Sequence, residues 1–90
     1  MNNNEIAKYF IDKVAADGFA VVPMNNDVPE KFGDVSPTTL GRIVRSLVPL
    51  GYLIQYFAAP NGVKTRKVLV PAGTTYTSML KRRDEIFKAE

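Results

Sequence analysis

Hydrophobic positions follow a helical period in the first part of the chain. Apolar residues recur at spacings of three and four between residues 6 and 14, with Asn4 as a candidate N-cap and Gly18 as a candidate C-cap. This pattern predicts a first helix over residues 1–18. Residues 19–22 are β-prone and are closed by a proline, which predicts a short strand or an extended connector.

Two further helices are predicted in the middle of the chain. The first covers residues 27–33, because a carboxylate pair with the spacing of a capping box begins at Asp27 and a proline lies in the first turn. The second covers residues 36–48. Ser36 is its candidate N-cap, and Pro49 is the residue that cannot continue it.

The pattern then changes to that of strands. Residues 52–57 and 65–70 are rich in aromatic and β-branched side chains, and an Asn-Gly pair between them is a strong signal for a tight turn. Together they predict a β-hairpin over residues 52–70. Apolar residues at helical spacing then predict a last helix over residues 74–89, opened by one of two adjacent threonines.

Composition favours a single folded domain. The chain has 90 residues, of which 46% are hydrophobic and 23% charged, so we expect one domain over residues 1–90. It has no apolar run of about 18 residues and no basic start with an apolar leader, which predicts a cytoplasmic protein without a membrane segment. Because cysteine and histidine are absent, we expect no disulfide, no metal, no cofactor and no enzymatic activity.

Charge is distributed unevenly, although the net charge is only +3. Residues 35–83 contain eight lysines and arginines and no aspartate or glutamate, whereas residues 1–34 and 84–90 each carry more acidic than basic side chains. A stretch of this length without a carboxylate predicts a polyanionic partner for that part of the chain. The alternative is a basic face that is simply solvated.

The predicted helix over residues 36–48 has one apolar and one polar side. The apolar stripe consists of Leu40, Ile43, Val44 and Leu47, and the opposite side carries Thr38, Arg42, Arg45 and Ser46. Gly41, on the flank, would let a partner approach closely. The DNA major groove admits such a helix, guanine accepts two hydrogen bonds from arginine, and thymine offers its methyl group to threonine. The alternative is an ordinary surface helix with its polar side in water.

The order of these elements is similar to that of a DNA-binding family. Residues 28–53 contain a turn with Gly33 and Val35-Ser36, then the run Thr-Leu-Gly-Arg-Ile-Val, and then the run Leu-Val-Pro-Leu-Gly-Tyr-Leu that leads into a strand. This segment resembles the winged helix-turn-helix pattern. The hairpin that follows resembles the wing, and residues 68–73 resemble the strand-to-helix junction of MarR-like regulators. The resemblance implies an α+β fold with a three-helix core, a two-stranded hairpin wing and a C-terminal helix.

The resemblance further implies a sequence-specific protein that binds double-stranded DNA and regulates transcription. The helix over residues 36–48 would lie in the major groove, and the wing over residues 58–67 would contact the flanking backbone or minor groove. Major-groove candidates are Ser36, Thr38, Thr39, Arg42, Arg45 and Ser46, and wing candidates are Asn61, Lys64, Arg66 and Lys67. Strand alternation places Lys64 and Arg66 on one side, where they can act as a pair. The alternative for the wing cations is protection of an exposed sheet edge.

The last predicted helix carries a broad stripe of large side chains. The stripe consists of Tyr76, Met79, Leu80, Arg83, Ile86 and Phe87. Regulators of this class commonly dimerise on palindromic sites, so we expect part of the stripe to form a homodimer contact. The alternative is a terminal helix that packs only on its own domain.

A second class of function is also open. Winged helices also bind proteins, so the chain would then be an interaction module that docks on an acidic partner. Partners that survive nuclease treatment would favour this class. Binding of single-stranded RNA is a weaker variant, because Tyr52, Tyr56 and Phe57 lie in the predicted hairpin, where we expect them to pack in the core.

Overall fold

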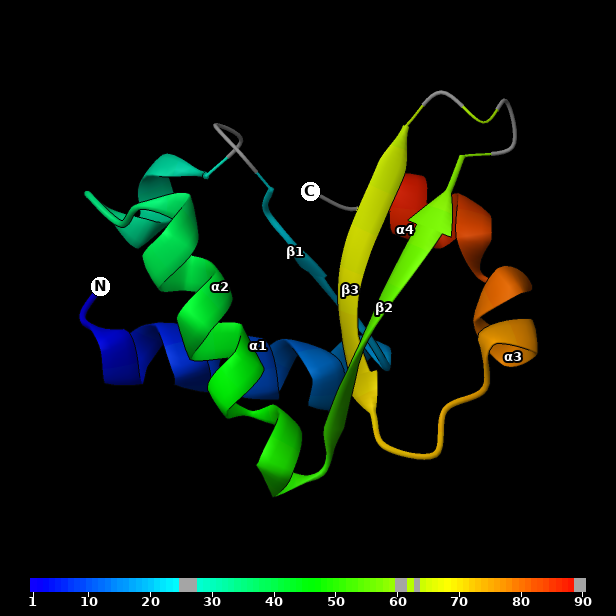
Figure 1. The fold of residues 1–90 in the computed structure, drawn as a ribbon, viewed down its shortest axis with the longest axis horizontal. Helices are drawn as coiled ribbons and strands as arrows, with labels where there is room; N and C mark the ends of the chain where they lie inside the picture. The colour runs from blue at the N-terminus through cyan, green and yellow to red at the C-terminus, as the bar shows by residue number, and fades with distance from the viewer. Residues whose placement is uncertain (25–27, 60–61, 63, 89–90) are drawn as a thin grey trace.

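The computed structural model describes residues 1–24, 28–59, 62 and 64–88, which form four α-helices and a three-stranded antiparallel sheet (Figure 1). The helices are α1 (Asn3–Asp17), α2 (Pro37–Ser46), α3 (Tyr76–Leu80) and α4 (Arg83–Lys88), and the strands are β1 (Ala20–Val22), β2 (Tyr52–Ala58) and β3 (Thr65–Pro71). Two 3₁₀ turns, η1 (Glu30–Phe32) and η2 (Val48–Leu50), flank α2. The predicted α+β class is confirmed. The predicted three-helix core is not found in the described residues, where α1, α2 and the 3₁₀ turn η1 precede the hairpin, and β1 makes the sheet three-stranded rather than two-stranded.

The central strand β3 divides the molecule into two cores. It pairs with β1 on one side and β2 on the other, and its side chains alternate between the two faces of the sheet. Leu69 is buried in a first core with residues of α1 and α2, whereas Val68 and Val70 are buried in a second core with residues of α3 and α4. The sheet therefore stands between α2 and the two C-terminal helices.

The N-cap of α1 lies two residues before the predicted one. The side-chain oxygen of Asn2 accepts a hydrogen bond from the Glu5 amide at 2.8 Å, and the Glu5 carboxylate accepts one from the Asn2 amide at 2.9 Å. Asn4 cannot form this reciprocal capping box, because the residue three positions later is Ala7. The helix ends as predicted at Gly18, which adopts the left-handed conformation with φ of 84°.

The helix predicted over residues 27–33 is a single 3₁₀ turn, η1. Its predicted start at Asp27 lies outside the described residues. Pro29 is extended, with ψ of 148°, and Gly33 has a positive φ of 76°, so only three residues can turn between them. Phe32 in this turn is buried and stacks on a phenylalanine of α1 at a centroid distance of 5.7 Å, which holds η1 against the first core.

The helix α2 starts at the predicted cap and ends earlier than predicted. The Ser36 Oγ accepts a hydrogen bond from the amide three residues later at 3.1 Å. The helix ends at Ser46 rather than at residue 48, because the Leu47 amide bonds to the carbonyl only three residues back. Pro49 lies inside η2 at one of its first positions, where its missing amide leaves no hydrogen bond unmade.

The predicted hairpin and the short strand before it are both present. β2 and β3 match the predicted runs 52–57 and 65–70 to within one residue, and residues 19–22 contribute a strand rather than a connector. The connection is longer than the predicted tight turn, because β2 ends at Ala58 and β3 begins at Thr65. Gly62 has a positive φ of 75° and its amide bonds to the Ala59 carbonyl at 2.8 Å, and Asn61 lies outside the described residues.

The single C-terminal helix predicted over residues 74–89 is instead two short helices. Thr75 is the N-cap of α3. After α3 the backbone tightens, and the Arg82 amide bonds to the carbonyl three residues back at 2.9 Å, which interrupts the α-helical hydrogen bonds. On both sides of this break a large apolar residue, Met79 in α3 and Ile86 in α4, is buried against the same face of the sheet.

Candidate nucleic-acid interface

The two sides of α2 divide as its sequence predicts. Leu40, Ile43 and Val44, together with Leu47 just after the helix, are buried in the first core, and Thr38, Arg42, Arg45 and Ser46 are exposed. The first turn of α2 lies toward the same end of the molecule as the ends of β2 and β3 at Ala58 and Thr65, in the upper part of Figure 1. The exposed side of α2 and the hairpin can therefore meet one extended partner.

Three of the residues predicted to contact DNA, Ser36, Thr39 and Ser46, form side-chain hydrogen bonds within α2 or at its start. The Ser36 Oγ donates to the Thr39 Oγ1 at 2.9 Å while it caps the Thr39 amide, and the Ser46 Oγ donates to the Ile43 carbonyl. Thr38 is exposed and makes no side-chain hydrogen bond to another described residue. The arginines and Thr38 are thus the side chains of α2 best placed to meet a partner.

The basic residues of α2 are not neutralised by the described acidic residues. The ion pairs within the described part of the chain are Lys8–Asp12 and Lys13–Asp17 inside α1, and Arg82–Glu85 at the start of α4. The hydrogen bond and the negative charge of Asp17 raise the pKa of Lys13, as expected of such a pair. Because Arg42 and Arg45 are in none of these pairs, their charges face solvent.

The structure separates the predicted wing cations. Lys64 is exposed next to the hairpin turn. Arg66 lies on the face of the sheet that carries α4, with its guanidinium 5.6 Å from the centre of the Phe87 ring. Lys67, the next residue of β3, lies on the opposite face and beside α2. Arg66 is therefore on the far side of the sheet from Arg42, although both were predicted to contact DNA.

Core packing is the wrong expectation for Tyr56, which is 54% exposed. Phe57 is buried and Tyr52 is partly buried in a core, as predicted. Strand alternation was the available signal, because it sets Tyr56 and Phe57 on opposite faces. The register of the hairpin places Tyr56 directly opposite Lys67. The α2–hairpin surface consists of Thr38, Gly41, Arg42, Arg45, Tyr56 and Lys67, and Lys64 lies outside β3, next to the hairpin turn.

The predicted dimer stripe packs largely within the molecule. Met79 and Ile86 are buried in the second core, and Leu80, Arg83 and Phe87 are partly buried around them. Tyr76 is 48% exposed, and its ring stacks on a buried phenylalanine of β2 at a centroid distance of 4.9 Å. The stripe thus covers the sheet of its own domain, and Met79 and Ile86 are not available to a second copy.

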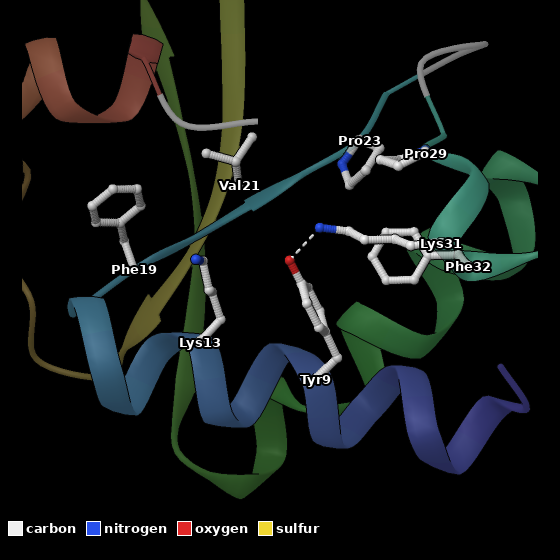
Figure 2. A pocket seen from close by; sticks show the side chains of 8 residues that line it. All are labelled: Tyr9, Lys13, Phe19, Val21, Pro23, Pro29, Lys31 and Phe32. Carbon is white, nitrogen blue, oxygen red and sulfur yellow. Dashed lines mark hydrogen bonds between the residues drawn. The ribbon is translucent and has the colours of Figure 1, made fainter.

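A small hollow lies between α1, β1 and η1 and is lined by residues of both cores, such as Phe32 of the first and Phe19 of the second (Figure 2). The Lys31 ammonium there donates to the Tyr9 hydroxyl at 2.6 Å and lies over the Tyr9 ring. The hollow has a volume of about 20 Å³, which is room for roughly one water molecule. Pockets for organic ligands are more than tenfold larger, about 300 Å³ and above, so we assign this hollow to packing rather than to ligand binding.

Neither a metal site nor a membrane helix occurs in the part of the chain that the structure describes. No three potential metal-ligating side chains come together there, and no described helix is both long and apolar enough to cross a bilayer. Comparison with known proteins finds no match to a protein-family model, to a curated protein or to a solved structure. We therefore infer function from the α2–hairpin surface alone.

Proposed function

We propose that this chain is a winged helix-turn-helix domain that binds double-stranded DNA and regulates transcription. In this proposal α2 lies in the major groove and the β2–β3 hairpin lies over the adjacent minor groove or its backbone. The observation that carries the proposal is the state of Arg42 and Arg45. Both are exposed on the unpacked side of α2, and neither is in an ion pair with another described residue.

The chemistry of α2 fits a base-reading role. An arginine can donate two hydrogen bonds to the O6 and N7 atoms of guanine, and a good pair of this kind discriminates against the wrong base by about 1–3 kcal/mol. Thr38, in the first turn of α2, can contact a thymine methyl group or a phosphate. The amides of that turn also favour negative charge.

The hairpin supplies a second set of contacts. Lys64 is exposed next to the turn, and the strand ends beside it lie toward the same end of the molecule as the first turn of α2 (Figure 1). A lysine at this place would contact phosphates, which positions the protein on DNA without reading its sequence. The hairpin would therefore contribute affinity, and the arginines of α2 would contribute specificity.

Selection of bound duplexes from a random pool, at two salt concentrations, tests the proposal. We expect an enriched sequence, and we expect Arg42→Ala to relax the preference and to weaken binding of that sequence by about 1–3 kcal/mol. Lys81→Ala, between α3 and α4 on the far side of the sheet, is the matched control and should leave the preference intact. Binding that is insensitive to salt and to Arg42→Ala would refute the proposal. A palindromic consensus would indicate that two copies bind together.

Exposed apolar side chains at η2 favour the interaction module as a second candidate. Leu50 is 69% exposed, and Val48 in the same turn is 36% exposed. Exposed apolar side chains mark protein contacts where they form one contiguous patch, whereas single ones are common on surfaces. Affinity capture with and without nuclease separates the two functions, because partners lost on nuclease treatment are held through nucleic acid. A defined acidic partner that survives nuclease would favour the module.

A further inference from the structure

The ammonium group of Lys67 lies between the sheet and α2. It lies in the central strand β3, between Val22 of β1 and Tyr56 of β2. Alternation places its side chain on the same face as Leu69, which is buried in the first core. Lys67 itself is only partly exposed, and a Cβ atom on Gly41 of α2 would lie 3.9 Å from its Nζ atom.

No described carboxylate neutralises this ammonium. The ion pairs of the described residues lie within α1 and at the start of α4, and residues 35–83 contain no aspartate or glutamate. The Lys67 residue is partly exposed and its Nζ atom is not among the buried polar atoms without a partner, so its stem can pack beside α2 while the charge stays accessible to an anion. Lys67 is therefore placed to receive an anion from outside the chain.

Gly41 keeps the flank of α2 open beside this ammonium. Glycine in the interior of a helix is less stable than alanine. Gly41 is not among the glycines with positive φ, so its backbone conformation does not require glycine. An alanine would also fit, because its methyl group would make only ordinary contact with the Lys67 Nζ atom. What glycine provides here is room for a partner to approach the helix.

We propose that Lys67, Gly41 and Tyr56 form a seat for one phosphate of the DNA backbone. This inference rests on the proposed function: when α2 lies in the major groove and the hairpin over the adjacent minor groove, the sugar–phosphate backbone between the grooves passes between them. Lys67 lies in that interval. Tyr56 is directly opposite Lys67 on β2, is 54% exposed, and carries a hydroxyl group that can donate to the same phosphate.

Fluorescence anisotropy with a labelled, random-sequence duplex tests the seat, because a phosphate contact does not depend on sequence. Lys67→Met keeps the apolar stem and removes the charge. We expect its affinity to fall about five- to tenfold, and the slope of log affinity against log salt to fall by about 0.9 in magnitude. Lys67→Arg should restore both.

Gly41→Ala should weaken binding several-fold although it raises the unfolding temperature, and Tyr56→Phe should weaken it about twofold.

Lys81→Met is the matched control, because it makes the same charge change on the far side of the sheet, between α3 and α4. Either of two results would refute the phosphate seat and leave the proposed function intact. One is that Lys67→Met and Lys81→Met have equal effects. The other is that Lys67→Met and Gly41→Ala leave binding unchanged while Arg42→Ala weakens it. If the unchanged protein binds no duplex, the proposed function and the seat both fall. Circular dichroism reports whether each variant is folded.

Discussion

The two faces of the sheet use the cations of one carboxylate-free stretch in different ways. On the α2 face, Arg42, Arg45 and Lys67 have no acidic partner among the described residues. The packed side of α2 consists of apolar residues, so its basic side stays in solvent or beside the sheet. Positive charge on this face is therefore available to a partner.

On the opposite face two of the cations, Arg82 and Arg66, make contacts within the molecule. The Arg82 Nε donates to the Glu85 carboxylate at 2.6 Å, and its guanidinium lies 4.9 Å from the centre of the Phe19 ring. Arg66 lies over the Phe87 ring. The carboxylate of Glu85 compensates the charge of Arg82, and the aromatic contacts hold both guanidinium groups against the second core. A run of positive charge along the sequence is therefore open to a partner only where the fold leaves its cations without partners of their own.

Removal of the largest side chain from each core should have the largest effect. We expect Phe32→Ala in the first core and Phe57→Ala in the second each to lower the free energy of unfolding by about 3–5 kcal/mol, because both rings are fully buried. Since β3 contributes to both cores, urea denaturation should still give a single transition. Tyr56→Ala, on the exposed part of β2, is the control and should stay within about 0.5 kcal/mol. Two separate transitions would mean that the two faces fold independently.

Two glycines that each lie beside a cation should respond to alanine with opposite signs. Gly18 has a left-handed φ of 84°, and a Cβ there would lie 2.5 Å from the Arg82 Nη1 atom, so Gly18→Ala should destabilise the fold by about 1–2 kcal/mol. Gly41→Ala in α2 should instead stabilise it by about 0.5–1 kcal/mol, because its backbone is helical. Thermal unfolding measures both, and a loss of stability in Gly41→Ala would contradict the open flank described above.

Substitution of Ser36 should separate its capping role from contact with DNA. Ser36→Ala removes the hydroxyl that caps α2 and should cost about 1 kcal/mol of stability. Ser36→Asp keeps a capping oxygen, so stability should change by only a few tenths of a kcal/mol. The added negative charge should nevertheless weaken DNA binding, if the start of α2 faces phosphates. Equal DNA affinity of Ser36→Asp and the unchanged protein would remove Ser36 from the interface.

The smallest effects are expected for two cations near the start of β3, Lys64 just before the strand and Arg66 within it. Lys64→Met should reduce the salt slope of DNA binding by about 0.9, the value for one phosphate contact. Arg66→Met should leave the slope unchanged. It should also alter stability by less than about 1 kcal/mol, because it loses the contact with the Phe87 ring but removes a buried Nε atom that lacks a hydrogen-bond partner. A slope change in Arg66→Met would place DNA on the C-terminal face.

Local signals predicted much of the fold. The cap at Ser36, the left-handed stop at Gly18 and the two strands of the hairpin are all present, because each depends on neighbours within a few residues. The second helix and the last helix were wrong in length. Residues 27–33 keep only a 3₁₀ turn held by aromatic packing on α1, and residues 74–89 divide into two helices that follow the sheet. Both outcomes depend on contacts with distant residues.

The outward side chains of α2 could be predicted from the sequence, because the helical period is a local property and the apolar stripe must be buried. Which hairpin residues join them depends on how the sheet packs against the helices. Adjacent residues of a strand point to opposite faces, and what covers each face depends on helices far away in the chain. For this reason Lys67 and Tyr56 lie on the face of α2, whereas Arg66 packs under α4.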